Sequence, residues 1–253
     1  MMELTRTDAI RSAYRLTGGN AFYDGMITCS TTLGKAVCRL VWDMGKDEND
    51  AYLQKALSGI PEDFSGRLLE VPVGTGVLTM PVYRTLPQAK ITCLDYSPDM
   101  MAQAKEKAQR LSLSNVTFRQ GDVGSLPFAD ESFDAVLSLN GFHAFPDKEA
   151  AYRETFRVLR PGGTFCGCFY VAGECRRTDL FIRRVYAPLH FFTPPYETAQ
   201  SLRARLEGLY ESAEVGCVKS IAWFVCRKAG EEKHDRSKSI SKRLPSGGAG
   251  RQS

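Results

Sequence analysis

The segment 68–79, with the sequence LLEVPVGTGVLT, constrains the fold of this chain more than any other stretch. A short apolar run ends in an acidic residue, Glu70, and two glycines, Gly74 and Gly76, follow where a helix is expected to begin. Glycine lacks a Cβ and tolerates positive φ, so a ligand can approach the backbone closely at such a loop. The first N–H groups of a helix are unpaired and favour a carboxylate or a phosphate. The segment therefore predicts a buried strand that passes through a ligand-binding loop into a helix.

Strand-like and helix-like apolar patterns alternate from residue 67 onward. Strands are predicted over 67–73, 90–95, 116–121, 133–139 and 164–171, and helices over 77–86, 98–111 and 148–159. Short connections in this order favour a doubly wound, mostly parallel α/β sheet with right-handed crossovers. A helix over 200–209 and two strands over 215–220 and 221–226 follow. The tight turn between these last strands makes one of them antiparallel to the rest.

Two regions depart from this alternation. Residues 1–60 read as a helical N-terminal cap, and residues 172–212 read as a lid insertion rich in Arg and aromatic side chains. From 229 to 253 the chain contains mostly polar residues and glycine, which predicts a disordered tail. The core domain is therefore expected over 61–228.

The amino-acid composition limits what kinds of partner this protein is expected to bind. The 33 basic and 29 acidic residues nearly balance, and no basic stripe with interleaved aromatics stands out, so nucleic acid is not an expected partner. No apolar stretch approaches the roughly 18 residues of a membrane span, and the N-terminus lacks the apolar core of a secretory signal. The eight cysteines form no C-x-x-C pair, which favours buried reduced thiols over a metal site. We expect a cytoplasmic protein without a metal.

Polar residues follow four of the predicted strands where each strand ends: Glu70, Asp95, Asp122 and Asn140. Ligands of open α/β sheets lie at the carboxyl ends of the strands, so we expect these side chains to converge on one ligand. Asp95 lies 19 residues after the second glycine, where an acidic side chain can accept hydrogen bonds from both ribose hydroxyls. Its alternative role is to cap the following helix. Asp122 and the Val123 N–H can read the amine and a ring nitrogen of adenine, and a surface turn is their alternative role.

This ordered set resembles the class I S-adenosylmethionine-dependent methyltransferases, and within them small-molecule enzymes such as the quinone-biosynthesis C-methyltransferases. LLEVPVGTG resembles the first motif of the family, and ITCLDYSPDMM its second-strand motif. GDVGSLPF, SFDAVLS and VLRPGGTF resemble the later motifs. The likeness covers about residues 66–171 and, more weakly, 193–228. Pro72 departs from the family, which usually has a glycine there, and it removes a backbone donor.

The resemblance implies a seven-stranded sheet of the Rossmann-like methyltransferase fold and S-adenosyl-L-methionine as the cofactor. It implies that Glu70 and the Gly74–Gly76 backbone hold the methionine part, that Asp95 holds the ribose, and that Asp122 with Val123 holds the adenine. The cofactor-binding residues expected on this basis are Glu70, Val71, Gly74, Thr75, Gly76, Asp95, Tyr96, Met100, Asp122, Val123, Leu139 and Asn140.

Methyl transfer from a sulfonium is an in-line displacement, which requires acceptor, methyl carbon and sulfur to lie in line in a site that excludes water. A base is needed only if the acceptor carries a proton, and His143, three residues past Asn140, is the candidate. The aromatic content of the cap and lid favours a small apolar or aromatic acceptor, and the alternative role of these rings is to pack the cap on the sheet.

Two other classes stay open. A nicotinamide-dependent oxidoreductase would need glycine at position 79, where Thr79 stands, and it would leave Asp122 and Val123 without a role. A non-catalytic S-adenosylmethionine-binding or regulatory protein fits the same motifs, and only turnover separates it from an enzyme.

Overall fold

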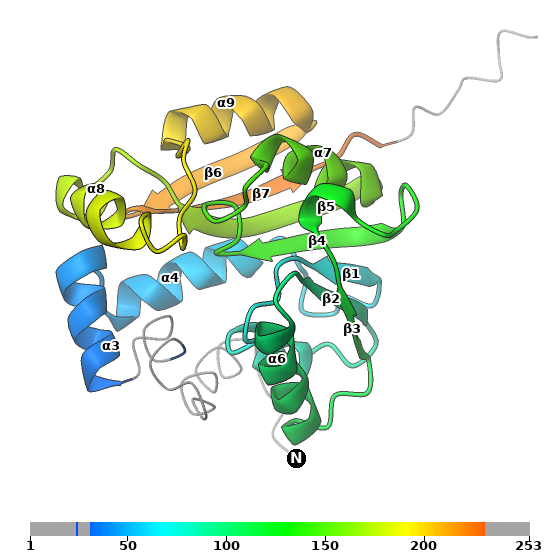
Figure 1. The fold of residues 1–253 in the computed structure, drawn as a ribbon. Coiled ribbons are helices and arrows are strands. Elements are labelled where there is room, and N and C mark those ends of the chain that lie inside the picture. The colour runs from blue at the N-terminus through cyan, green and yellow to red at the C-terminus, as the bar shows by residue number, and fades with distance from the viewer. Residues whose placement is uncertain (1–23, 25–30, 231–253) are drawn as a thin grey trace, which may run out of the picture.

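The computed structural model describes residue 24 and residues 31–230. Its centre is a seven-stranded sheet in the order β3-β2-β1-β4-β5-β7-β6 (Figure 1). The strands are β1 (Arg67–Glu70), β2 (Lys90–Asp95), β3 (Val116–Gln120), β4 (Phe133–Leu139), β5 (Leu159–Tyr170), β6 (Ser212–Val218) and β7 (Ile221–Arg227). Strands β1 to β5 pair in parallel, and β7 is antiparallel to both β5 and β6. The predicted mostly parallel seven-stranded sheet is confirmed.

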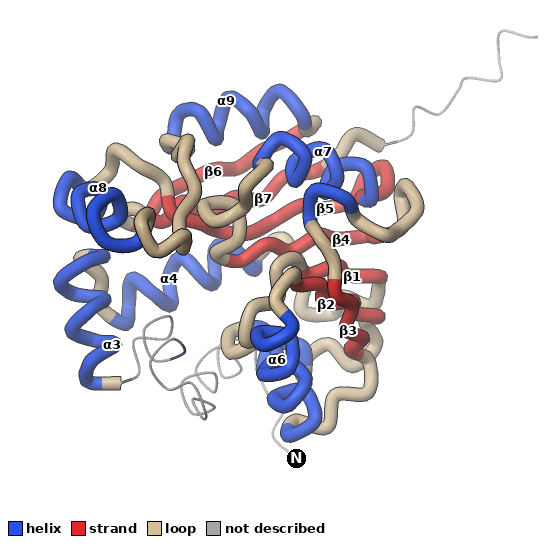
Figure 2. Tube along the Cα trace, in the orientation of Figure 1, coloured by secondary structure: helices blue, strands red, loops and turns tan. Residues whose placement is uncertain are grey.

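Helices cover both faces of the sheet (Figures 1 and 2). They are α3 (Thr32–Val37), α4 (Lys46–Leu57), α5 (Thr79–Tyr83), α6 (Pro98–Arg110), α7 (Lys148–Val158), α8 (Arg176–Phe181) and α9 (Ala199–Leu209), with short irregular turns η1 (Cys38–Trp42), η2 (Val123–Ser125) and η3 (Ile182–Tyr186). One apolar core lies between the sheet and α4, α5 and α6, and a second lies between the sheet and α7 and α9. The doubly wound arrangement follows from these two cores.

The alternation of side chains along the central strands explains why both faces need helices. Leu68 and Leu137 belong to the core under α4, whereas their chain neighbours Leu69 and Val136 belong to the core under α7. Successive side chains of a strand point to opposite faces, so a continuously apolar strand is stable only between two layers.

Several predicted boundaries were wrong by a few residues, and strand β6, for example, spans Ser212–Val218 and not 215–220. Strand β1 ends at Glu70, because the chain then turns into the glycine loop. Helix α5 is short, since Thr85 and Leu86 donate to carbonyls three residues back instead of four, which closes the helix. Strand β5 begins at Leu159, which pairs with Phe133 before the register shifts.

The predicted cap and lid pack on each other. The Thr178 hydroxyl of α8 donates to the Val41 carbonyl of η1 at 2.6 Å, and Arg177 donates to Asp43 at 2.9 Å. Helix α4 lies in the same apolar core as β5 and β7. The division of the chain at residue 60 stays a prediction, and the tail beyond residue 230 lies outside the described residues.

Six cysteines are free in the described part of the chain: Cys93, Cys166, Cys168, Cys175, Cys217 and Cys226. Cys38 is disulfide-bonded, so the expectation of reduced thiols is wrong at this position. Within residues 24 and 31–230, no group of three or more His, Cys, Asp or Glu side chains is placed to hold a metal ion. In that same part, no helix has the length and apolar character needed to cross a bilayer.

The contact between β4 and β5 tolerates no side chain at Gly167. A Cβ at this position would lie 2.0 Å from the Ser138 carbonyl oxygen, which is backbone and cannot move aside. We expect Gly167→Ala to lower the free energy of unfolding by about 1–3 kcal/mol, measured by urea denaturation. Gly208→Ala in α9 is the control, because a Cβ there meets nothing within 4 Å and should stabilise by about 0.5–1 kcal/mol. Equal effects at both glycines would contradict this packing.

Candidate functional site

The strand order reverses beside β1, which has β2 on one side and β4 on the other. Ligands of open α/β sheets bind at such a switch point, beyond the carboxyl ends of the strands. The register pairs Glu70 with Cys93 and Leu137, and Asp95 with Gln120, so four strands end along one edge. The sheet thus brings the loops that follow β1, β2, β3 and β4 together, as the sequence predicted.

The glycine loop after β1 is held between two strands. The Val71 N–H donates to the Leu137 carbonyl of β4 and the Val73 N–H to the Leu94 carbonyl of β2, both at 2.9 Å. Gly74 and Gly76 then adopt positive φ of 56° and 67°. A Cβ on Gly76 would collide with Met80, whereas one on Gly74 would meet nothing within 4 Å. Gly76 is therefore needed for packing, and Gly74 leaves open space above the loop.

Asp95 ties the end of β2 to this loop. Its Oδ2 accepts from the Gly74 N–H at 2.7 Å, its Oδ1 accepts from the Ser97 N–H at 2.8 Å, and the residue is 6% exposed. Burial raises the pKa of this carboxyl, and the backbone N–H bonds act in the opposite direction. Each carboxylate oxygen can accept a second hydrogen bond. Asp95 therefore keeps some acceptor capacity beyond its backbone partners.

Ser97, and not Asp95, caps the helix that follows β2. Ser97 is the N-cap of α6, and its hydroxyl accepts from the Met100 N–H at 3.3 Å.

Tyr96 follows Asp95 and is 77% exposed. An aromatic ring beside a buried carboxylate offers a face on which a planar heterocycle can stack. Met100, one turn into α6, is half-buried nearby in the chain.

Glu70 lies apart from these groups. It is buried, and its Oε2 accepts from the Tyr83 hydroxyl at 2.8 Å and from the Cys93 thiol at 3.5 Å. Burial raises the pKa of Glu70 to about 8. These contacts connect β1, β2 and α5 inside the protein, so the expected contact of Glu70 with the methionine part stays a prediction.

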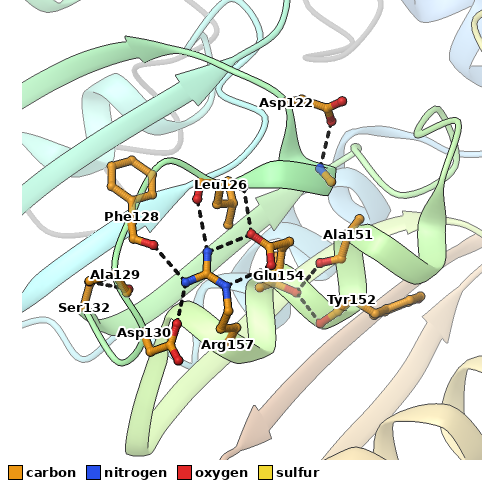
Figure 3. A network of polar contacts seen from close by, with 12 residues as sticks. Asp122, Leu126, Phe128, Ala129, Asp130, Ser132, Ala151, Tyr152, Glu154 and Arg157 are labelled. Carbon is orange, nitrogen blue, oxygen red and sulfur yellow. Dashed lines mark hydrogen bonds and ion pairs between the residues drawn. The ribbon is translucent and has the colours of Figure 1, made fainter.

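The loop that begins with Asp122 is fixed by α7 (Figure 3). Asp122 is exposed, its Oδ1 accepts from the Gly124 N–H at 2.8 Å, and Val123 is buried. Glu154 accepts from the Leu126 N–H at 2.8 Å. Arg157 donates to the carbonyls of Leu126 and Phe128, to Glu154 and to Asp130. Two side chains of one helix therefore hold the loop in place.

Leu139 and Asn140 end β4. Leu139 is buried, and Asn140 has a φ of 54°, which asparagine tolerates better than most residues. A Cβ on the next residue, Gly141, would lie 2.3 Å from Pro72 Cδ. The unusual proline of the glycine loop is thus packed against a glycine of the β4 loop.

The contacts of Thr75 involve two residues, Asp24 and Lys107, that the sequence analysis missed. Its hydroxyl donates to Asp24 Oδ1 at 2.6 Å, and Asp24 Oδ2 pairs with Lys107 Nζ of α6 at 3.0 Å. Asp24 is 0% exposed and Lys107 3% exposed. Lys107 adjoins the apolar stripe of Ala104 and Ala108, and a lysine in that position was the available signal. A buried ion pair therefore joins the N-terminal region, the glycine loop and α6.

His143 has contacts that argue against a base. Its Nδ1 accepts from the Tyr170 N–H at 3.4 Å, and its ring stacks on Phe192 at a centroid distance of 4.1 Å. Burial, with a smaller effect from Lys148, lowers its pKa to about 3. A neutral imidazole that accepts at Nδ1 carries its proton on Nε2 and can only donate there. The role of His143 as a base stays a prediction, and its contacts favour positioning.

A mostly parallel sheet of this order, with a glycine loop and an acidic residue on the adjacent strand, defines the Rossmann-like class of nucleoside-cofactor domains. Residues 68–163 match the model of a family described as a methyltransferase domain.

Two curated proteins and one solved structure are also similar to this chain. A demethylmenaquinone methyltransferase of Thermus thermophilus is 41% identical over 97 residues, which are 38% of this chain and 44% of that protein. A ubiquinone/menaquinone biosynthesis C-methyltransferase of Nitrobacter hamburgensis is 36% identical over 140 residues, 53% of this chain and 55% of that protein. The structure of an S-adenosylmethionine-dependent methyltransferase of Thermotoga maritima has a TM-score of 0.57 at 20% identity, over 80% of this chain and 98% of that chain. The chain spans about half, or less, of the length of these two sequence relatives. These similarities support a class I S-adenosylmethionine-dependent methyltransferase domain over residues 68–163.

The raised pKa of Glu70 predicts a pH-dependent stability. The folded state keeps this carboxyl protonated up to about pH 8, whereas the unfolded chain ionises near 4.5. Its contribution to stability is complete below pH 4.5 and is lost as pH rises toward 8. We expect Glu70→Gln to gain stability relative to wild type between pH 5 and pH 8, by on the order of 2–3 kcal/mol in urea denaturation. Asp99→Asn, at an exposed carboxylate, should show no such trend, and a Glu70→Gln difference that stays constant with pH would contradict the raised pKa.

The buried pair of Asp24 and Lys107 predicts strong coupling. Asp24→Asn leaves the Lys107 ammonium buried without its counter-charge, which we expect to cost about 3–5 kcal/mol of unfolding free energy. The double variant Asp24→Asn/Lys107→Met should recover most of this loss, as measured in a double-mutant cycle by urea denaturation. The exposed pair of Asp43 and Arg177 is the control, and Asp43→Asn should cost much less. Additive losses in the cycle would contradict the coupling.

Proposed function

We propose that this protein transfers a methyl group from S-adenosylmethionine to a small apolar or aromatic acceptor by in-line displacement. The observation that carries the proposal is the Asp95 carboxylate, held by two backbone N–H groups beside the open space at Gly74. A ribose requires paired acceptors of this kind, and the exposed Tyr96 ring adjoins them in the chain. These acceptors therefore fit the ribose of an adenosyl cofactor.

The other expected residues have roles consistent with this fit. Asp95 would bind the ribose hydroxyls, while Tyr96, Met100, Asp122 and Val123 would enclose the adenine. The amino-acid end would meet the backbone around Gly74, Thr75 and Gly76, with Val71, Leu139 and Asn140 flanking it. The bound cofactor supplies a methyl group activated on a sulfonium, and the protein contributes orientation and exclusion of water.

An aromatic cluster beyond the ends of β4 and β5 supports an apolar acceptor. Trp42 of η1, Tyr170 of β5 and Phe192 of the lid lie within 5.4–6.2 Å of one another, centroid to centroid. Tyr186 and His143 stack on Phe192 from the lid and the β4 loop. Tyr170 and Phe192 are buried in this cluster, and aromatic side chains of this kind commonly line sites for apolar and ring-shaped ligands. The names of the two sequence relatives refer to menaquinone or ubiquinone, so a quinone-like ring is the acceptor class that we propose.

Turnover tests the proposal against a non-catalytic cofactor-binding protein. Purified protein is incubated with S-adenosylmethionine that carries a radiolabelled methyl group and with a panel of hydroquinones, phenols and amines. We expect label in a hydroquinone product and inhibition by S-adenosylhomocysteine. Calorimetric binding of S-adenosylmethionine without turnover across the panel would favour a binding protein, and heat with NAD alone would exclude the proposal.

Asp95 should control cofactor affinity. We expect Asp95→Ala to raise the Kd for S-adenosylhomocysteine about ten- to a hundredfold, because hydrogen bonds to a charged group are worth about 1.5–3 kcal/mol. Calorimetry measures the change, and a melting curve verifies that the variant is folded. Asp99→Ala, four residues on in α6 and exposed, is the matched control and should keep the wild-type Kd. An unchanged Kd for Asp95→Ala would limit Asp95 to holding the glycine loop.

A further inference from the structure

Exposed apolar side chains gather on one part of the surface. Among the described residues, seven large hydrophobic side chains are exposed, and five of them lie on η1, α8, η3 and the turn that follows. These five are Leu40, Leu180, Val185, Leu189 and Phe191. Leu40 is 67% exposed and Phe191 57% exposed. One such side chain is ordinary, whereas a group of them can mark an interaction surface. We refer to these five residues and the exposed bases around them as the lid face.

The elements that carry the lid face pack next to one another. Helix α8 packs against η1 through the buried hydrogen bond from Thr178 to the Val41 carbonyl, and Arg177 donates to the Arg39 carbonyl. Figure 1 shows α8 beside the end of α3 at the same side of the molecule. Thr178 and Ile182 are buried on one side of these helical turns, so Leu180, Arg183 and Arg184 point outward.

Positive charge surrounds these apolar side chains. The exposed bases of the lid face are Lys35, Arg39, Arg176, Arg177, Arg183 and Arg184. The acidic residues of the same elements are fewer, and two of them are engaged. Asp43 pairs with Arg177 and Lys219, and Asp179 accepts from the Tyr170 hydroxyl and the Gly173 N–H. Glu174 is the third, and Glu48 of the adjoining helix α4 interacts with Arg39, so the six bases still outnumber these acids.

We propose that the lid face docks on the surface of an anionic lipid bilayer. Exposed leucine and phenylalanine among arginines is the pattern of a segment that lies in the membrane interface, with its apolar side chains among the acyl chains and its bases on the phosphates. Two copies of the lid face would bring like charges together, which disfavours a symmetric dimer through this surface. Docking would present the aromatic cluster behind the lid to apolar molecules dissolved in the bilayer.

Vesicle flotation tests the proposal without reference to methyl transfer. The full chain is mixed with vesicles of phosphatidylcholine alone or of phosphatidylcholine and phosphatidylglycerol in equal parts. We expect the protein to float with the anionic vesicles, to float much less with the neutral ones, and to be released by high salt.

Two variants and a matched control locate the contact. The variant Leu189→Gln/Phe191→Ser removes apolar side chains that the structure shows exposed, and we expect its partition onto anionic vesicles to fall at least about tenfold. The variant Arg183→Gln/Arg184→Gln should fall by a similar factor and lose much of its salt dependence. The control Arg153→Gln/Leu209→Gln removes an exposed base and an exposed leucine on α7 and α9, and it should partition as wild type. Far-UV circular dichroism and melting curves verify that each variant is folded.

Three outcomes would overturn the proposal. The first is equal flotation with neutral and anionic vesicles, and the second is a loss of binding in the control variant as large as in the lid variants. The third is a wild-type protein that does not float and forms a dimer in size-exclusion chromatography, while Leu189→Gln/Phe191→Ser is a monomer. The last would assign the lid face to a second copy of this chain.

Discussion

The hydrogen bonds of the Asp95 carboxylate are the interaction on which the site depends. This side chain ends β2, yet it holds the Gly74 N–H of the loop after β1 and the Ser97 N–H before α6. One buried anion therefore sets the relative position of two strand ends and a helix. A Cβ on Gly74 would meet nothing within 4 Å, so the loop that Asp95 orders also leaves open space next to it.

Around this centre, segments distant in the sequence hold the loops in place. Asp24 connects the N-terminal region to Thr75 and Lys107, and Arg157 of α7 holds the loop that carries Asp122 and Val123. Each of these contacts satisfies a buried or half-buried polar group, which would be costly if left unpaired. Loops of a binding site gain order in this way without regular secondary structure of their own.

The residues around the ends of β4 and β5 have a different chemistry from those of the glycine loop. Tyr170, Phe192 and Trp42 come from a strand, the lid and the cap, and they meet through ring contacts rather than through hydrogen bonds. His143 joins this cluster as a stacked, neutral ring, because burial lowers its pKa to about 3. A polar half at β1, β2 and β3 and an aromatic half at β4, β5 and the lid are consistent with a charged cofactor and an apolar acceptor meeting between them.

The sequence by itself determined the order of strands and helices, the position of the glycine loop and the acidic residues at the strand ends. These features are local, since apolar periodicity and loop glycines depend on the chain neighbours of each residue. Only the tertiary structure decided which way each side chain points and which charged groups pair. Glu70 and Asp95 both end strands, but Tyr83 and Cys93 bind Glu70 in the interior, whereas Asp95 faces the loop. The pairing of Asp24 with Lys107 spans 83 residues of sequence, and the burial of His143 depends on a ring from the lid. Such contacts form only when distant segments pack, so no local pattern encodes them.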